Sequence, residues 1–172
     1  MDHIGVLGNT LEEIAENKAG IMKPSCQAVV TAPQKPFVFR ILQEKTEECG
    51  CQIRIAHPEK AKVKRELMDG QIFSYEEYED IHLNLIGRYQ IDNAVTVLEA
   101  VKALNENGAV IPEDAVRAGF AKVIWQGRFQ VLEREPLMIA DGAHNQDAAL
   151  RLAENVRTYL AGRRIIGVMG VF

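Results

Sequence analysis

The sequence has no long hydrophobic run, no excess of basic residues and few cysteines. None of its apolar stretches approaches the roughly 20 residues that span a bilayer, and the beginning (MDHIGVLGNT) has no basic segment followed by an apolar one. The 20 Lys and Arg against 24 Asp and Glu give a net charge of −4, so no general basic field attracts nucleic acid or anionic lipid. We expect neither a membrane nor a nucleic-acid partner, and any anionic ligand needs a local site.

The cysteines are Cys26, Cys49 and Cys51, an odd number in a chain without secretory features. This favours free thiols in a reducing cytoplasm over a disulfide framework, and Cys49-Gly50-Cys51 lacks the second ligand pair of a zinc site. The composition of the 172 residues is otherwise that of an ordinary globular protein, with 47% hydrophobic and 26% charged residues. The length suits one domain, or one domain with part of another.

Apolar periodicity predicts an α/β chain. Residues 11–19 and 36–48 show helical spacing, and residues 27–31 and 52–56 read as strands, so the second helix connects a parallel β-α-β unit. Strands are predicted next at 63–67, 71–75 and 82–85, followed by helices at 92–107 and 113–120.

The pattern restarts beyond Gly127. Predicted strands at 129–132 and 137–140, a helix at 146–160 and a strand at 165–169 begin a second β-α-β unit. We therefore predict a domain boundary near Gln126, with one partial domain over residues 1–126 and another over residues 127–172.

Two positions near the beginning are candidate metal ligands. His3 and Lys18 are compatible with solvent-exposed side chains. Alternatively, a lysine that is carbamylated by carbon dioxide offers oxygen ligands, and beside an imidazole it could help to bind Mg²⁺.

Three further motifs carry candidate ligand-binding side chains. Asn93 lies near the start of the strongest predicted helix, where Asp92 or Asn93 could cap the helix or an amide could contact a nucleotide. Arg128, in Trp125-Gln126-Gly127-Arg128 at the predicted boundary, suits either phosphate binding or an interdomain salt bridge. The run DGAHN at 141–145 follows a predicted strand and precedes a helix, the usual ligand position in an α/β sheet.

Within DGAHN, Asp141 and His144 are the candidate functional groups, whereas Asn145 could simply cap the following helix. We expect Asp141 on an exposed loop, so that its replacement by Ala changes folding stability by well under about 1 kcal/mol.

The motifs together resemble those of folylpolyglutamate synthases, including bifunctional dihydrofolate synthases, in the Mur ligase superfamily. The run DH…LG.T…IA..KAGI.KP, from Asp2 to Pro24, is followed in the family's order by Leu85, Gly87, Gln90 and Asn93, then by Trp125, Gly127 and Arg128, then by DGAHN. Tyr89 stands where many relatives have His, and Gln126 where many have Pro. The family's GKGS-type phosphate loop does not occur in this sequence, which resembles a truncated central-to-carboxy-terminal part of the family.

The resemblance implies part of a Mur ligase-like ATP-binding domain followed by the start of a Rossmann-like carboxy-terminal domain. It implies an ATP- and Mg²⁺-dependent, cytoplasmic and monomeric parent enzyme that adds L-glutamate to folates, or also makes dihydrofolate, through an acyl phosphate. His3 and carbamylated Lys18 would bind Mg²⁺, Asn93 would contact ATP, Arg128 would hold phosphate, and Asp141 and His144 would line the nucleotide and glutamate side. Another Mur-type amino-acid ligase and a noncatalytic nucleotide-binding or assembly module are the alternatives, and we expect the chain alone to be inactive.

Overall fold

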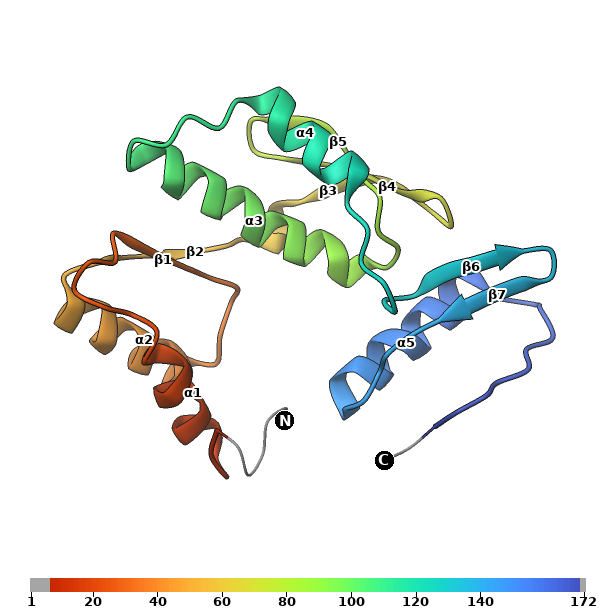
Figure 1. Cartoon of the computed structure of the whole chain (residues 1–172), viewed down its shortest axis with the longest axis horizontal. Coiled ribbons are helices and arrows are strands. Elements are labelled where there is room, and N and C mark those ends of the chain that lie inside the picture. The colour runs from red at the N-terminus through yellow and green to blue at the C-terminus, as the bar shows by residue number, and fades with distance from the viewer. Residues whose placement is uncertain (1–6, 171–172) are drawn as a thin grey trace.

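The computed structural model describes residues 7–170, which form a mixed α/β chain (Figure 1). The helices are α1 (Leu11–Ala19), α2 (Pro36–Cys49), α3 (Arg88–Glu106), α4 (Glu113–Lys122) and α5 (Gln146–Tyr159), with a short 3-10 helix η1 (Pro58–Lys60). The strands are β1 (Ala28–Thr31), β2 (Gln52–Ile55), β3 (Lys62–Leu67), β4 (Gly70–Tyr75), β5 (Tyr78–Leu83), β6 (Gln130–Arg134) and β7 (Leu137–Ala140). No helix in residues 7–170 is long and apolar enough to cross a membrane.

The first predicted β-α-β unit is confirmed. β1 pairs with β2 in parallel from Ala28 opposite Gln52 to Thr31 opposite Ile55, and α2 makes the connection between them. Gly50 ends α2 in a left-handed conformation with φ of 68°, which glycine adopts without a steric penalty. Helix α1 packs on α2 and begins at Thr10, whose hydroxyl accepts a hydrogen bond from the Glu13 amide at 3.2 Å.

The main core lies between the antiparallel β3–β4–β5 sheet and helices α3 and α4. Phe73 and Phe120 meet edge to face with their ring centroids 6.4 Å apart, and Ile81, Ile91 and Leu98 are fully buried around them. α3 also packs on β1 and β2, so this helix joins the β-α-β unit to the antiparallel sheet (Figure 1). The position of the amino end of α3 therefore depends on both the β-α-β unit and the antiparallel sheet.

A half-buried charge network holds the other end of α3. The ammonium of Lys102 lies 2.5 Å from a Glu76 carboxylate oxygen, 3.4 Å from Glu99 and 5.2 Å from the centre of the Tyr75 ring. A guanidinium nitrogen of Arg54, in β2, lies 3.2 Å from the other carboxylate oxygen of Glu99. Burial opposes the charge on Lys102, but the surrounding carboxylates outweigh it and raise the pKa of Lys102. Lys102 therefore stays charged, and the network fixes α3 against β2 and the β4–β5 turn.

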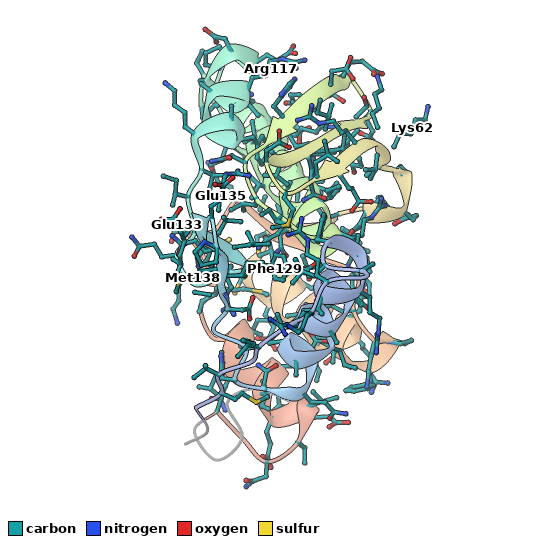
Figure 2. All side chains as sticks on the ribbon, turned by 90° about the vertical axis from the view of Figure 1, so that its right-hand side faces the viewer. Lys62, Arg117, Phe129, Glu133, Glu135 and Met138 are labelled. Carbon is teal, nitrogen blue, oxygen red and sulfur yellow. The ribbon has the colours of Figure 1, made fainter. Side chains whose placement is uncertain are left out.

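The last part of the chain is an antiparallel β6–β7 hairpin with α5 beside it (Figure 1). Phe129, directly before β6, is 1% exposed, and its ring lies 5.8 Å from that of Tyr159 in α5. Figure 2 shows Phe129 toward α5, whereas Glu133, Glu135 and Met138 lie on the outer side of the hairpin. This aromatic contact holds the start of the hairpin against α5 and thereby positions the loop between β7 and α5.

Two predicted element starts are wrong by four residues each, and one predicted strand is absent. α3 begins at Arg88 rather than at 92, because its first turn is buried through Gln90 and Ile91 even though its sequence is mostly polar. β5 begins at Tyr78 rather than at 82. The predicted strand at 165–169 is absent, since residues 163–170 form neither helix nor strand and no described strand lies beside them to supply hydrogen bonds; Ile166 is 86% exposed.

Candidate functional site

A pocket of about 570 Å³ lies where the start of α3, the segment before β6 and the start of α5 meet. Its volume is in the range usual for sites that bind small molecules, about 300–1,000 Å³. Four of the predicted site residues line it, although they come from three separate motifs: Asn93, Arg128, Asp141 and His144. The other lining residues are Tyr89, Gln90, Asp92, Trp125, Asn145, Asp147, Ala148, Arg151 and Leu152.

Backbone hydrogen bonds hold the 141–145 loop against the segment that carries Arg128. The Gly142 amide donates to the Gly127 carbonyl at 2.7 Å. The Asp141 carboxylate accepts from the Phe129 amide through Oδ2 and from the Ala143 amide through Oδ1, each at 2.8 Å. Asp141 therefore organises the loop and is half-buried, so the expectation of an exposed, structurally neutral Asp141 is wrong.

Arg128 has the features of an anion-binding residue. Its side chain is half-buried, it lines the pocket, and no hydrogen bond or ion pair within residues 7–170 engages its guanidinium. The interdomain salt bridge considered for Arg128 is therefore not formed among the described residues. A guanidinium without a partner at the edge of a pocket can take a phosphate group through two parallel hydrogen bonds.

Tyr89 lies among the charged groups of the pocket. Burial raises the pKa of its phenol, and the Asp141 carboxylate raises it further, while the Gln90 hydrogen bond, Arg128 and Arg151 act in the opposite direction. Its hydroxyl therefore stays protonated at neutral pH and can donate a hydrogen bond to an anion. The sequence gives only a weak signal for this residue, its place between Gly87 and Gln90 in GRYQ.

Asn93 lies in the second turn of α3 and does not cap the helix, because Gly87 occupies the cap position. Its amide nitrogen donates to Gln90 Oε1 at 3.1 Å, which orients the exposed Asn93 side chain at the pocket. The alternative of a cap at Asp92 or Asn93 is therefore wrong. Asn145 does cap its helix, since its Oδ1 accepts from the Ala148 amide at 2.8 Å.

His144 is exposed directly before α5, and its Nδ1 lies 2.9 Å from the Gly142 carbonyl. The tight 141–145 loop therefore positions this imidazole at the pocket.

Lys18 does not belong to the pocket. It is exposed on α1, no hydrogen bond or ion pair within the described part of the chain engages its ammonium group, and it is absent from the pocket lining. His3, the other predicted metal ligand, lies outside the described residues. Within residues 7–170 no three His, Cys, Asp or Glu side chains are placed to hold a metal ion. These residues alone do not fit a magnesium site, so no step of a reaction is assigned to the metal.

Asp92 and Arg151 are lining residues that the sequence analysis missed. Arg151 follows Asp147 by one helical turn, so helical spacing from DGAHN was the available signal. Burial raises the pKa of Asp92, although Arg88 and Arg151 oppose this.

We predict that Asp92→Asn stabilises the chain at neutral pH. A carboxyl whose pKa is raised in the folded state favours that state at low pH, where the carboxyl is protonated. This stabilisation is lost as the pH rises through the unfolded-state pKa, about 3.9, towards the folded-state pKa. The neutral amide avoids that loss. Thermal midpoints measured from pH 3 to 8 should show the variant's advantage only at the higher pH values, and an advantage that is constant with pH would contradict the assignment.

The pocket rests on a close contact between α5 and the turn before α3. Gly87 has φ of 106°, and a Cβ there would lie 2.6 Å from Asn155 Oδ1 and 2.8 Å from Tyr89 Cε1. Gln71, buried in β4, donates from Nε2 to the Leu85 and Gly87 carbonyls at 2.9 and 3.0 Å. The turn before α3 is therefore held by β4 of the sheet on one side and by α5 on the other.

Comparison with solved structures defines the class of protein. Folylpolyglutamate synthase of Mycobacterium tuberculosis, complexed with ADP, matches with a TM-score of 0.77 at 33% identity, over 92% of this chain and 37% of that one. An FPGS–AMPPCP–folate complex matches with a TM-score of 0.82 at 28% identity, over 96% and 41%. The fold is that of the folylpolyglutamate synthase structures, with their Mur ligase-like domains, and the predicted fold class is confirmed.

Sequence comparison gives the family. No family model matches the chain. The dihydrofolate synthase/folylpolyglutamate synthase of Bacillus subtilis is 36% identical over 170 residues, which are 95% of this chain and 39% of the relative. The chain thus spans about two fifths of the length of the curated relatives. Over that part its homologues are folylpolyglutamate and dihydrofolate synthases, which confirms the resemblance.

Proposed function

We propose that this chain supplies the nucleotide-binding side of an ATP-dependent ligase that adds L-glutamate to folates. The observation that carries the proposal is the pocket that gathers Asn93, Arg128, Asp141 and His144 from three motifs. The similarity to synthases solved with ADP and with AMPPCP and folate supports it.

The roles proposed for the pocket residues follow from their contacts. The Arg128 guanidinium, which has no hydrogen-bond or ion-pair partner among the described residues, binds phosphate, and the Asn93 amide, oriented by Gln90, contacts the nucleotide. Trp125, which is 55% exposed at the same pocket, offers an aromatic surface. Asp141 fixes the loop and presents His144 towards the glutamate side. ATP in such an enzyme phosphorylates the folate-linked carboxylate, and the glutamate amine then displaces phosphate from the acyl phosphate.

We further propose a division between residues 1–126 and 127–172, into parts of an ATP-binding and a carboxy-terminal domain, in a monomeric cytoplasmic parent that uses Mg²⁺. The pocket lies at the proposed division, because Trp125 and Arg128 flank residue 126. Ligands often bind at such domain junctions. Lys18 and His3 remain the proposed magnesium ligands, to be completed by groups beyond those described.

Titration of the chain with AMPPCP or ADP tests the nucleotide site. We expect Arg128→Ala to weaken binding by about 10- to 100-fold, because a charge-assisted hydrogen bond contributes about 1.5–3 kcal/mol. The matched control is Arg157→Ala, which removes the same charge from an exposed position on α5 outside the pocket. Equal affinities for the two variants would overturn the role of Arg128, and no binding by the unaltered chain would overturn the proposed site.

A noncatalytic nucleotide-binding module is the second candidate, favoured by a pocket in which Asn93 and Arg128 can contact a nucleotide. We expect the chain alone to bind nucleotide without turnover, since phosphoryl transfer depends on positioned backbone donors and cations around the phosphates. Phosphate release that requires both L-glutamate and a folate would contradict this expectation. Another Mur-type ligase would show release with a different acceptor.

A further inference from the structure

The three cysteines, scattered in the sequence, come together at one end of the parallel β1–β2 pair. Cys26 lies two residues before β1 and Cys51 lies directly before β2. The pairing of Ala28 with Gln52 extends one step back, because the Gln52 amide donates to the Gln27 carbonyl at 3.1 Å. Cys51 therefore lies opposite Gln27, and Cys26 lies one residue further back at the same edge of the strand pair.

The Cys26 and Cys51 thiols lie within interaction range of each other. The Cys26 thiol donates to the Ala28 carbonyl at 3.2 Å, which fixes its direction, and the Cys51 thiol interacts with that of Cys26. All three thiols are free and half-buried, so a small oxidant can reach them. No metal-binding group of three includes them in the part of the chain that the structure describes, which leaves thiol chemistry.

The backbone suits a bond between Cys26 and Cys51 better than one with Cys49. Neighbouring strands lie about 4.8 Å apart, and the offset of one residue adds about 3.3 Å along the strand, so the Cα separation stays within the range of about 4.4–6.8 Å that a disulfide bridges. Cys49 is the last residue of α2, and the Cα–Cβ bonds of a helix point back towards its amino end. Cys49 affects the pKa of Cys51 only through charge, whereas the Cys26 thiol also hydrogen-bonds to Cys51.

We propose that Cys26 and Cys51 form a reversible disulfide when the chain meets a hydroperoxide. One thiolate attacks the peroxide, so an S–O bond forms, the O–O bond breaks and the oxidised cysteine is a sulfenic acid. The second thiol then attacks that sulfur, the S–S bond forms, and the S–O bond breaks with loss of water. Overall, two thiols lose two electrons and two protons, and hydrogen peroxide is reduced to two molecules of water.

The disulfide closes the β1-α2-β2 unit into a covalent loop. A crosslink restricts the unfolded chain more than the folded chain, in which the two positions are already adjacent, so oxidation stabilises this unit. Burial, together with the neighbouring thiols, raises the pKa of Cys51 and limits its thiolate at neutral pH. The reaction is therefore slow compared with that of peroxidase cysteines, and the bond accumulates under sustained oxidation.

The test is oxidation of the purified chain with hydrogen peroxide, alkylation of the remaining thiols and peptide mapping. We expect a Cys26–Cys51 crosslinked peptide within one chain, a free Cys49, and a raised thermal midpoint that dithiothreitol reverses. Cys49→Ser, the matched control, should keep both effects, whereas Cys26→Ser should lose both. The mapping on the unaltered chain does not depend on how the variants fold. A crosslink through Cys49, crosslinks only between chains, or no crosslink would each overturn the proposal.

Discussion

Gly87→Ala is expected to destabilise the chain by on the order of 3 kcal/mol and to weaken nucleotide binding as well. The left-handed φ of 106° costs an alanine about 1–2 kcal/mol, and forcing a methyl group into a packed contact costs about 1–3 kcal/mol more. The methyl would lie 2.6 Å from Asn155 Oδ1 and must push α5 away from the start of α3. Because both helices line the pocket, the damage extends to the ligand site.

Gly108→Ala is the matched control for this prediction. Gly108 also has a positive φ, 93°, but nothing lies within 4 Å of the position that its Cβ would occupy. It therefore reports the backbone strain alone, and we expect a loss of only about 1 kcal/mol with unchanged nucleotide affinity. Denaturant midpoints of the two variants give the comparison. Equal losses would show that the contact between Gly87 and α5 contributes nothing.

Local signals predicted most of the regular elements because the responsible residues are close in sequence. Pro36 and Gly50 bound α2, and Thr10 caps α1, so each helix end is specified by one or two side chains. The β-α-β unit followed from strand and helix order together with the handedness of the connection.

The predictions that failed concern segments whose structure depends on residues distant in the sequence. The first turn of α3 is polar in sequence and is buried only because Gln71, in β4, binds the carbonyls before it. The run 165–169 is apolar enough for a strand, but a strand needs a neighbour to share its hydrogen bonds, and none lies beside it in residues 7–170.

The candidate site was predictable to the extent that it lies in motifs. Asn93, Arg128, Asp141 and His144 lie in separate motifs and meet at one pocket. Asp92, considered only as a helix cap, and Arg151, which lies in no motif, enter the pocket through helix geometry. The exposed position expected for Asp141 is wrong, because a carboxylate bound to two backbone amides has no signature in the sequence.

Asp141→Ala is the second large effect, an expected loss on the order of 3 kcal/mol in unfolding free energy. The carboxylate accepts two backbone hydrogen bonds at 2.8 Å, and hydrogen bonds to charged groups contribute about 1.5–3 kcal/mol each, reduced here by partial exposure. Removing the carboxylate leaves the Phe129 and Ala143 amides without acceptors. Phe129 also has a positive φ of 44°, a conformation that this hydrogen bond helps to hold.

Two further variants separate the loop-fixing role of Asp141 from its negative charge. Asp141→Asn keeps one carbonyl oxygen that can accept a single amide, so its loss should lie between those of the wild type and Asp141→Ala. Asp147→Ala removes the same charge from an exposed residue of the same pocket and should cost under about 1 kcal/mol. Urea unfolding gives the free energies, and titration with AMPPCP gives the affinities. The 141–145 loop positions both Arg128 and His144. We therefore expect nucleotide affinity to fall in the same order as stability, with the largest loss for Asp141→Ala, a smaller loss for Asp141→Asn and the smallest loss for Asp147→Ala. If Asp141→Ala unfolds like the wild type, the two backbone contacts do not hold the loop, and the carboxylate acts on bound ligand alone.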